Sequence, residues 1–374
     1  MHLTDLLTPQ VLVDRTRLLA NIDRMQAGAD AHTVALRPHA KTHKIPLIAK
    51  WQIERGAVGI CCAKIGEAEV FADAGIDDIR LPYPVNPVNA ARLLALMGRC
   101  RVSIIVDHLG VARGWSDVMQ AAGRTLDVLV KVDVGSHRCG IAAALPDSLG
   151  FVQQVAAMPG LRLRGLLSHA GHSYGAASDR ALAQVAGDEA DLLNAISDAA
   201  CELGIAIEEV SVGATPTARF SVAEAGVTEL RPGTYAYYDR SQVRLGAARL
   251  EDCALTVLAM VVSKPASDRL VLDCGSKTLS ADPARGFDKP GGFGVLFSDL
   301  CATSADEDLA VEKLSEEHAV VRVSSGSTRL EPGDRVRVLP NHACPVSNLV
   351  DTVRLVDGLE VLDTLPVAAR GKIV

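Results

Sequence analysis

The sequence predicts an α/β protein with a TIM-like (β/α)8 barrel followed by a second domain that is mostly β. Three observations predict this fold. The chain has 374 residues, more than one compact core usually accommodates, which favours two domains. Short apolar runs alternate with helix-compatible stretches through the first two thirds of the chain. From about Cys253 onward, β-branched runs are instead separated by Gly, Pro and Asp turns.

The barrel prediction depends on eight short apolar runs, most of them separated by Ala-rich amphipathic stretches such as 15–29 and 66–74. The runs are 34–36, 58–62, 78–81, 102–106, 126–134, 163–167, 208–212 and 229–231. Eight βα units suit a closed barrel. A doubly wound sheet is the alternative, but the Gly-x-Gly-x-x-Gly motif that would follow its first strand is missing. We therefore expect residues 15–250 to form the barrel.

The second domain is predicted over residues 251–374 from four β-branched runs, at 255–262, 270–273, 319–323 and 336–339. Near the amino terminus, Val11-Leu12-Val13 forms a further short apolar run after a proline. We expect residues 1–14 to return and join this β domain.

Composition excludes several classes of protein. The net charge is −7 and the basic residues are dispersed, which argues against nucleic-acid and anionic-membrane partners. The amino terminus lacks a charged and apolar leader pattern, and no run approaches the roughly 20 apolar residues of a membrane span. Nine cysteines at irregular spacing suit reduced thiols. We expect a soluble, cytoplasmic protein that acts on small molecules.

The most informative motif is the octet Arg37-Pro38-His39-Ala40-Lys41-Thr42-His43-Lys44, which follows the first apolar run. The proline ends the strand, so Lys41 is expected at the barrel rim. A partly desolvated lysine crowded by other cations, here Arg37 and Lys44, loses its proton readily and suits Schiff-base chemistry with an aldehyde cofactor. A solvated basic loop or a plain anion site is the alternative.

The ends of the seventh and eighth predicted strands suggest a phosphate site. Barrel chemistry lies at the carboxyl ends of the strands, and phosphate commonly binds between the loops after these two. Gly213 and Thr215 follow the seventh strand, and Gly233 and Thr234 follow the eighth. Their backbone amides and hydroxyls are expected to converge on one anion. Taken singly, such residues are ordinary turn formers.

Two more strand ends carry candidate side chains. After the fifth run, Arg138 follows a bend and is suited to pair the phenolate of a pyridoxal ring, with a surface ion pair as the alternative. After the sixth run, the segment Ser168-His169-Ala170-Gly171-His172-Ser173-Tyr174 is dense in imidazole and phenol groups. His169 is expected to stack on or bond to the ring, and Tyr174 to reach the substrate.

The β domain contains a candidate metal pair. His342 and Cys344 are two residues apart after an apolar strand, a spacing that places both on one face of a strand. Imidazole and thiolate together suit a borderline or soft divalent ion, zinc foremost, with water or substrate at the remaining positions. The nearby charged turn Glu316-Glu317-His318 is expected to help position the site, although ordinary surface turns look the same.

Taken together these motifs resemble a known family, the D-threonine aldolase and D-serine dehydratase group of fold-type III pyridoxal phosphate enzymes. The resemblance covers nearly the whole chain and rests on residues 37–44, Arg138-Cys139-Gly140, 213–217, Gly233-Thr234, Glu317-His318 and His342-x-Cys344. It implies an alanine-racemase-like barrel with a β domain, assembled as a homodimer.

The resemblance also implies roles for individual residues. Pyridoxal 5′-phosphate is expected on Lys41, with a divalent metal on His342 and Cys344. The phosphate contacts then fall at Gly213, Thr215, Gly233 and Thr234, Arg138 faces the phenolic oxygen, and His169 and Tyr174 line the pocket. Zinc is favoured by the thiolate, with manganese as the second choice.

A carbanion-stabilising cofactor and a Lewis acid in one pocket allow two reactions of a D-3-hydroxy amino acid. Loss of the Cα proton and of hydroxide gives a 2-oxo acid and ammonia, whereas loss of the hydroxyl proton leads to glycine and an aldehyde. Cys344 favours dehydration, because known aldolases of this group more often carry aspartate at that position. The segments Gly59-Ile60-Cys61-Cys62, Val132-Asp133-Val134 and Arg138-Cys139-Gly140 look more like the aldolase branch. The leading hypothesis is a dehydratase and the alternative an aldolase.

Two further hypotheses have weaker support. An alanine-racemase-type mechanism needs a tyrosine from the β domain, and all five tyrosines of this chain lie in the barrel half, at positions 83, 174, 235, 237 and 238. A cofactor-carrying binding protein would keep Lys41 but lack the metal. The side chain of the substrate remains open, since Arg219 and Arg240, which would favour an acidic substrate, are equally well explained as surface charges.

Overall fold

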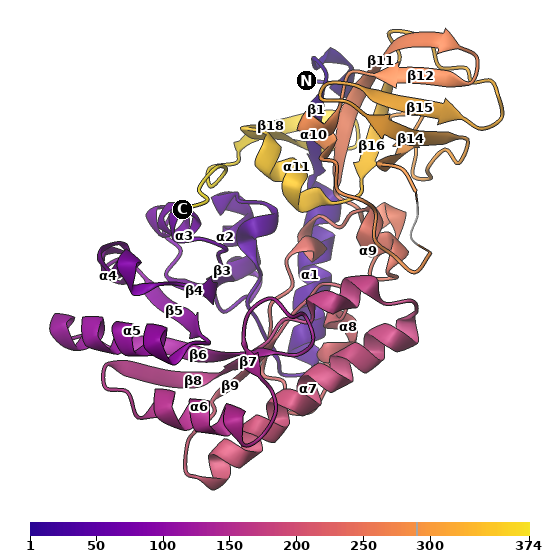
Figure 1. Cartoon of the computed structure of the whole chain (residues 1–374). Coiled ribbons are helices and arrows are strands. Elements are labelled where there is room, and N and C mark those ends of the chain that lie inside the picture. The colour runs from indigo at the N-terminus through magenta and orange to yellow at the C-terminus, as the bar shows by residue number, and fades with distance from the viewer. Residues whose placement is uncertain (289–290) are drawn as a thin grey trace.

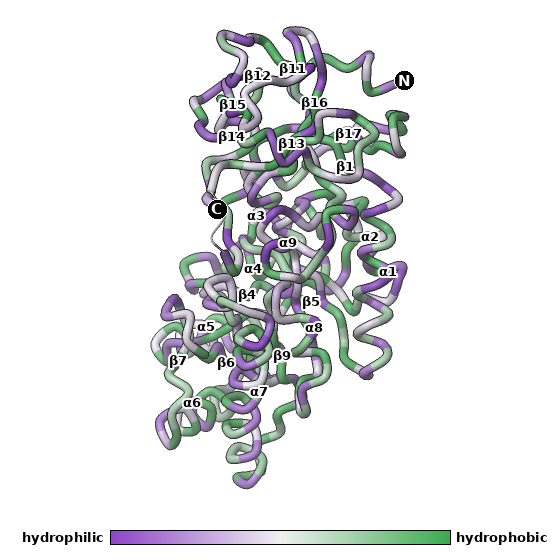
Figure 2. The backbone as a smooth tube through the Cα atoms, turned by 90° about the vertical axis from the view of Figure 1, so that its right-hand side faces the viewer, coloured by the Kyte–Doolittle hydropathy of each residue, from purple (hydrophilic) through white to green (hydrophobic). Residues whose placement is uncertain are grey.

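The computed structural model describes residues 1–288 and 291–374, which form a barrel part and a β part stacked along the long axis of the molecule (Figure 1). The chain end returns from the β part to the barrel, where the backbone N–H of Gly66 donates to the carbonyl of Val374 at 2.9 Å. Figure 2 places this end beside α3 (Ile65–Asp73) in a second view. No helix in these residues combines the length and apolarity that a membrane crossing needs.

The barrel part is an eight-stranded parallel sheet in the order β2-β10-β9-β8-β6-β5-β4-β3. Its strands are β2 (Ala35–Leu36), β3 (Ile60–Cys61), β4 (Asp78–Pro84), β5 (Arg101–Val106), β6 (Leu126–Asp133), β8 (Leu161–Leu167), β9 (Glu209–Val212) and β10 (Glu229–Leu230). The two ends of the sheet meet through the parallel bridge between His39 and Cys61, where Cys61 N–H donates to the Pro38 carbonyl at 2.8 Å. Each predicted apolar run overlaps one of these strands, so the predicted TIM-like barrel is confirmed.

Helices surround this sheet because each buries one apolar face against it. They are α1 (Arg15–Ala31), α2 (Pro46–Glu54), α3, α4 (Ala90–Met97), α5 (Leu109–Ala122), α6 (Asp147–Ala156), α7 (Asp179–Glu202), α8 (Ala218–Ser221) and α9 (Arg240–Arg244), with the short strand β7 (Ile141–Ala142) beside β6. Helix α1 begins where the Asp14 side chain accepts from Arg17 N–H, and α5 ends at Gly123 with a left-handed φ of 60°. Trp115 of α5 is fully buried and donates to the Val85 carbonyl at 2.7 Å.

The β part contains β1 (Gln10–Asp14) and eight later strands. These are β11 (Leu255–Ala266), β12 (Arg269–Leu272), β13 (Gly294–Phe297), β14 (Leu309–Leu314), β15 (Ala319–Val323), β16 (Arg335–Pro340), β17 (Thr352–Asp357) and β18 (Glu360–Pro366), with helices α10 (Ser276–Leu279) and α11 (Ala343–Leu349). The order β12-β15-β14-β13-β16-β11 closes on itself because β11 also pairs with β12. Strand β1 joins this sheet by pairing antiparallel with β11 and parallel with β17.

An apolar core connects the two parts. Buried side chains from α1 and α2, including Leu18, Ile22 and Ile48, form one cluster with buried residues of the β part such as Val257 and Val338. Because this cluster spans both parts, the residues that face each other across the junction are held in fixed positions.

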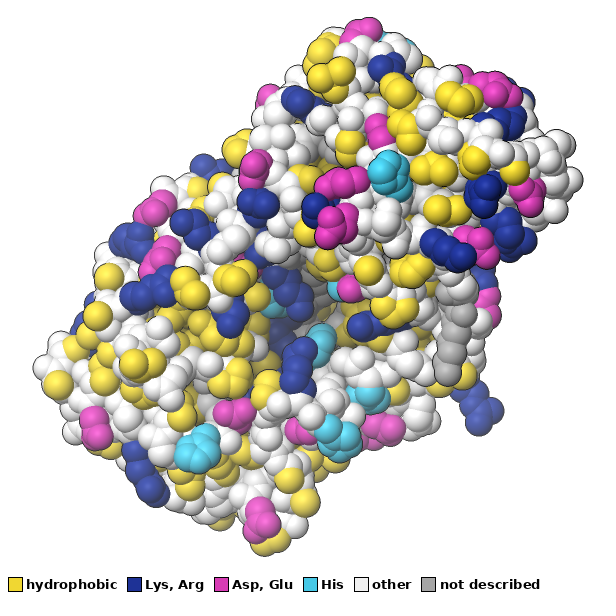
Figure 3. Space-filling model, turned by 45° about the horizontal axis from the view of Figure 1, so that its top comes forward, with side chains coloured by type: hydrophobic (Ala, Val, Ile, Leu, Met, Phe, Trp, Pro, Cys, Tyr) yellow, Lys and Arg dark blue, Asp and Glu magenta, His cyan; other side chains and the backbone are white. Residues whose placement is uncertain are grey.

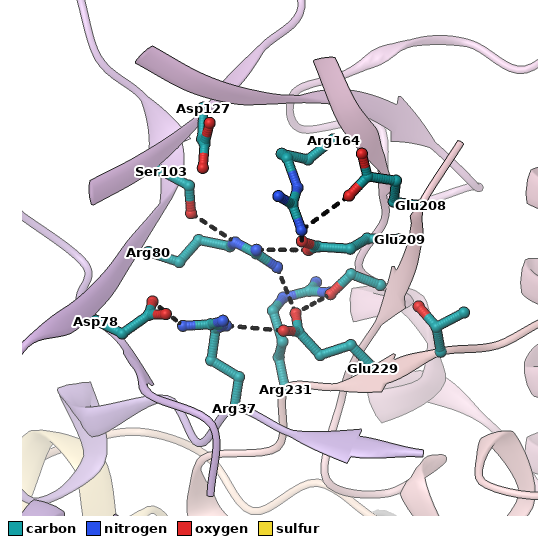
Figure 4. A network of polar contacts seen from close by, with 12 residues as sticks. Arg37, Asp78, Arg80, Ser103, Asp127, Arg164, Glu208, Glu209, Glu229 and Arg231 are labelled. Carbon is teal, nitrogen blue, oxygen red and sulfur yellow. Dashed lines mark hydrogen bonds and ion pairs between the residues drawn. The ribbon is translucent and has the colours of Figure 1, made fainter. Parts of the chain in front are cut away.

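The interior of the barrel contains a buried layer of ion pairs (Figure 4). At its centre, Glu229 accepts from Arg37 Nε at 2.7 Å, from Ser211 Oγ at 2.5 Å and from Arg80. Arg37 also pairs with Asp78 at 2.5 Å, and Arg80 with Glu209 at 2.6 Å. Burial opposes ionisation of Glu229, but the charges of Arg80 and Arg37 lower its pKa to about 2.

The lowered pKa of Glu229 makes the stability of the fold depend on pH. The folded-state pKa of about 2 lies below the ordinary value of 4.5, so ionised Glu229 stabilises the fold above pH 4.5. That contribution is lost as the pH falls from 4.5 through about 2.

We predict that Glu229→Gln lowers the free energy of unfolding by about 3 kcal/mol, because two buried guanidinium groups lose a shared charge while each keeps one other carboxylate. Urea unfolding followed by fluorescence of Trp51 and Trp115 measures the change. The control Glu202→Gln, at the exposed end of α7, should change stability by less than about 0.5 kcal/mol. Equal stability of Glu229→Gln and the unaltered protein would contradict the role given to this carboxylate.

Candidate active site

Lys41 lies just beyond the end of β2, in a single helical turn at Ala40–Thr42. His39 precedes this turn and accepts from Lys41 N–H through its Nδ1 at 3.4 Å. Burial, together with the charges of Lys41 and Arg231, holds the pKa of His39 well below 6.5, so this imidazole is neutral. The turn thus directs an amine into the barrel mouth beside an uncharged ring, the rim position predicted for Lys41.

The expectation that Arg37 and Lys44 crowd Lys41 is wrong. Arg37 points into the barrel interior, where Glu229 and Asp78 neutralise it. Lys44 pairs with buried Glu67 at 2.8 Å. Lys41 lines a cavity at the barrel mouth, which we call the lysine cavity. The other basic side chains that line it are Arg138, Lys131 and Arg231, which lie in or after other strands.

The loops after β9 and β10, where the sequence predicts a phosphate site, lie at the lysine cavity. Thr215, Gly233 and Thr234 line the same cavity as Lys41, and Gly233 N–H donates to Thr215 Oγ1 at 3.3 Å. A Cβ on Gly233 would lie 3.0 Å from Thr42 Oγ1 and 3.1 Å from the His39 carbonyl. Only glycine therefore lets the β10 loop approach the lysine turn this closely.

Gly213 does not line the cavity itself. Its carbonyl accepts from His169 Nδ1 at 2.5 Å. Because a carbonyl only accepts, Nδ1 of His169 carries the proton and Nε2 is the unprotonated nitrogen. Burial, with the charges of Lys41 and Lys131, holds the pKa of His169 well below 6.5. The side chain that His169 presents to the cavity is thus a neutral imidazole with its proton on Nδ1.

Arg138 and Tyr174 approach this cavity from the loops after β6 and β8. The first loop is ordered by Asp133, whose carboxylate accepts from Gly135 N–H at 3.0 Å and His137 N–H at 3.1 Å. Burial raises the pKa of Tyr174, so its phenol remains neutral. Its hydroxyl oxygen accepts from Gln242 Nε2 at 3.4 Å.

The lysine cavity continues into an outer cavity of about 260 Å³ between the two parts of the molecule. Lys41, Arg138, His169, Tyr174 and Thr234 line both. Figure 3 shows Lys, Arg and His side chains gathered in a hollow between these parts. The structure thus brings the residues predicted for the cofactor, the substrate and the metal to this region, although Gly213 reaches it only through its hydrogen bond with His169.

His342 and Cys344 line the outer cavity with Lys41, but not in the way predicted. Strand β16 ends at Pro340, His342 precedes α11, and Cys344 lies in its first turn. The expectation that both lie on one face of a strand is wrong, because the chain has already turned into a helix. Cys344 Sγ lies 3.2 Å from Thr42 Oγ1 and 3.6 Å from Thr234 Oγ1. The thiol therefore touches both segments that shape the lysine cavity.

Asp282 fixes the orientation of His342, since its Oδ2 accepts from His342 Nδ1 at 2.7 Å. The other ring nitrogen, Nε2, is then left to face Cys344. Burial disfavours a charged His342, but Cys344 and Asp239 raise its pKa to about 9. Burial likewise disfavours the thiolate, but the hydrogen bond and charge of His342 bring the pKa of Cys344 below 9.0.

This imidazole and thiolate fit a divalent ion of the zinc type, which would replace the proton they share. No cluster of three or more His, Cys, Asp or Glu side chains suited to a metal occurs in residues 1–288 and 291–374. An ion on this pair would thus keep positions open for water or substrate.

The turn Glu316-Glu317-His318 does not contribute to either cavity. It connects β14 to β15 on the exposed side of the β part, where Lys277 pairs with Glu317 at 2.9 Å and Glu316 at 3.3 Å. The expected positioning role is wrong, because these charges are satisfied by a neighbouring surface lysine.

Sequence reasoning missed several polar residues of the site, among them Lys131, Arg231, Asp239 and Asp282. Lys131 is buried at the end of β6, where burial and the charge of Arg231 lower its pKa to about 7. In the sequence, Lys131 could have been recognised as the single lysine within the mostly apolar run 126–132. Asp239 accepts from Ala343 N–H at 2.9 Å and so fixes the segment between His342 and Cys344.

Two family models match the chain. Residues 13–241 match the model of the alanine racemase N-terminal domain, and residues 254–356 match a putative serine dehydratase domain. The division between these matches falls in the short link between the barrel and β11.

Individual proteins are similar over nearly the whole chain. A D-threonine aldolase from Arthrobacter sp. is 37% identical, covering 97% of this chain and 93% of that protein. A D-threo-3-hydroxyaspartate dehydratase from Delftia sp. (strain HT23) is 33% identical and covers 90% of each chain. A solved structure of a variant D-threo-3-hydroxyaspartate dehydratase in the metal-free form superposes with a TM-score of 0.91, at 30% identity and 98% coverage of both chains.

We predict that the His169 ring is neutral, with the proton on Nδ1, at pH values around its ordinary pKa of 6.5. Nitrogen NMR of the imidazoles, with His169→Gln used to assign the signals, tests both statements. A signal that titrates near 6.5 and disappears in His169→Gln would contradict them.

Proposed function

The chain belongs to the D-threonine aldolase and D-serine dehydratase family of alanine-racemase-like pyridoxal phosphate enzymes, and we propose that it is a metal-dependent dehydratase of D-3-hydroxy amino acids. The observation that carries this proposal is the outer cavity, in which Lys41 of the barrel and the His342–Cys344 pair of the β part face the same space. An amine for the cofactor and two donors for a metal are thereby within reach of one small substrate.

The residues around Lys41 suit pyridoxal 5′-phosphate. The Gly233 backbone and the hydroxyls of Thr215 and Thr234 offer small, uncharged donors for a phosphate, and Arg138 offers a guanidinium for the phenolic oxygen. Arg231 adds buried positive charge to the same cavity, which favours an anionic cofactor.

We assign the metal to His342 and Cys344, with zinc first and manganese second. The thiolate favours a borderline or soft ion over magnesium or calcium. Asp282 belongs to this arrangement, because its bond to Nδ1 holds the ring with Nε2 toward Cys344.

When bound, pyridoxal phosphate supplies an electron sink for the bonding pair at Cα, and the metal supplies a Lewis acid for the β-hydroxyl. The proton transfers are then carried out by residues of the chain. Lys41 Nζ is the base that takes the Cα proton. His169 holds a neutral Nε2 at the shared wall of the two cavities, and neutral Tyr174 offers a hydroxyl. Loss of hydroxide from Cβ completes the dehydration and leaves an enamine, which tautomerises to an imine after release; water then hydrolyses the imine to a 2-oxo acid and ammonia.

An aldolase is the second candidate, favoured by the 37% identity to the Arthrobacter D-threonine aldolase. In that reaction a base removes the hydroxyl proton and the Cα–Cβ bond breaks, giving glycine and an aldehyde. His169 Nε2 is an unprotonated acceptor at the cavity wall and therefore suits this step as well.

We further propose that residues 15–250 and 251–374 act as the cofactor-binding and metal-binding domains, with residues 1–14 belonging to the second. The protein is expected to work as a cytoplasmic homodimer, with a small amino acid as its substrate. These proposals rest on the family resemblance and on the two sheets.

We predict that the protein loaded with pyridoxal phosphate and zinc or manganese converts D-threonine to 2-oxobutanoate and ammonia, and leaves L-threonine unreacted. Product analysis by chromatography and an ammonia assay distinguishes the two candidates. Glycine and acetaldehyde would instead establish the aldolase. If bulkier and acidic D-3-hydroxy amino acids also fail to react, lyase function is excluded.

We predict that Cys344→Ala loses stoichiometric metal and turnover but keeps the visible absorbance of the bound cofactor, because the thiolate binds only the metal. Asp282→Asn should weaken metal binding by roughly ten- to a hundredfold, since it removes the group that orients His342. Metal analysis after dialysis and competition with a chelator measure both changes.

The control for these variants is Asp268→Asn, in the exposed turn between β11 and β12, which should bind metal normally. Full metal content in Cys344→Ala would refute the assigned ligand pair.

A further inference from the structure

Arg285 lies on the loop that follows α10, and its side chain lines the outer cavity together with His342 and Cys344. We propose that Arg285 binds a carboxylate of the amino-acid substrate and thereby determines which substrates the enzyme accepts. This inference rests on the proposed lyase function and adds to it the residue that recognises the substrate.

The backbone of this loop is attached on both sides of Arg285. The N–H of Arg285 donates to Ser241 Oγ at 3.1 Å, and Ser241 Oγ in turn donates to the Asn341 carbonyl at 2.7 Å. At the next residue, a Cβ on Gly286 would lie 2.3 Å from Arg244 Cβ, so the loop packs tightly against α9. Three residues earlier, Asp282 is bonded to His342. Arg285 therefore projects from a segment whose position is coupled to the metal pair.

The side chain of Arg285 is also oriented. Its Cζ lies 5.2 Å from the ring centroid of Tyr174, whose hydroxyl hydrogen-bonds Gln242. Packing on an aromatic face holds a guanidinium plane while leaving its N–H edge free to donate. Less side-chain entropy is then lost when an anion binds.

The guanidinium of Arg285 has no carboxylate partner within ion-pair distance among the residues described, whereas neighbouring Arg244 pairs with Asp288. Arg219 and Arg240, the two arginines that the sequence suggested for an acidic substrate, are engaged elsewhere. Arg219 pairs with Asp179 at 2.6 Å, and Arg240 donates to the Gly291 carbonyl at 2.8 Å. Neither lines the outer cavity.

The other cations of the site already have assignments. Lys41 and Arg138 are placed on the cofactor, and His342 on the metal. Lys131 and Arg231 line only the inner, lysine cavity, where Arg231 donates to Ser211 Oγ at 2.5 Å. Arg285 is thus the remaining guanidinium in the outer cavity, and a planar fork of N–H donors matches a carboxylate.

The relevant anion is a carboxylate in either of two positions. Every 3-hydroxy amino acid carries an α-carboxylate, and 3-hydroxyaspartate carries a second one on its side chain. A metal on the neighbouring pair and Arg285 would then hold the substrate at two points, its hydroxyl and its carboxylate.

Steady-state kinetics of the cofactor- and metal-loaded protein test this proposal with D-threonine and D-threo-3-hydroxyaspartate as substrates. For Arg285→Gln we expect KM to rise roughly ten- to a hundredfold, with a smaller change in kcat, because a charge-assisted hydrogen bond to the substrate is lost. Arg285→Lys should show a smaller rise in KM, since lysine keeps the positive charge but lacks the planar pair of N–H donors. The control Arg249→Gln removes an arginine whose side chain is 82% exposed, and should leave KM unchanged.

The two substrates distinguish the two carboxylates. An equal rise in KM for both places Arg285 on the α-carboxylate, and a rise confined to 3-hydroxyaspartate places it on the side-chain carboxylate. Unchanged KM for both substrates in Arg285→Gln, with normal turnover by the unaltered enzyme, overturns the proposal while leaving the lyase function intact. Absence of turnover in the unaltered enzyme would refute both the lyase function and this inference. The cofactor absorbance of Arg285→Gln should match that of the unaltered protein, which separates a recognition role from damage to the fold.

Discussion

The site depends on the charge of Glu229, which holds Arg37 and Arg80 inside the barrel. A TIM-like barrel is usually filled by layers of apolar side chains. Here one layer is ionic, and each charge is stable in the interior only because its partners are fixed. Arg37 directly follows β2 and lies four residues before Lys41. Through Ser211, Glu229 is also linked to Arg231 at the floor of the lysine cavity. The layer that stabilises the barrel therefore also positions the groups at its mouth.

The second constraint is the contact between the two parts of the molecule. Cys344 belongs to the β part, yet its sulfur lies against Thr42 and Thr234 of the barrel. Because an apolar core fixes that junction, His342, Cys344 and Lys41 share one cavity. Burial near several cations keeps His39 and His169 neutral. The region thus combines fixed positive charge, suited to an anionic cofactor, with a neutral His169 ring whose Nε2 is an unprotonated acceptor.

The barrel was predictable because its strands are short apolar runs buried on both faces, whereas several strands of the β part were not. Strand β18, for example, contains Glu360, Asp363 and Thr364 and is largely exposed, so it has no apolar signature. The positions of Lys41, Arg138 and the loops after β9 and β10 at the cavity were predictable because the strand ends of this architecture lie together at one face of the barrel. Arg37 was misjudged because its partner Glu229 is 192 residues away in the sequence. The roles of Asp282 and Arg285 arise from a loop that only the fold brings to His342 and Tyr174.

In the proposed function, Lys41 binds the cofactor in the cavity that His342 and Cys344 also line. Borohydride reduction of the protein loaded with pyridoxal phosphate, followed by peptide mass spectrometry, tests it most directly, because reduction traps the cofactor on the lysine to which it is bound. We expect a pyridoxyl group on the peptide that contains Lys41, and none after Lys41→Ala. A pyridoxyl group on Lys131 or another lysine, or persistent labelling in Lys41→Ala, would contradict it.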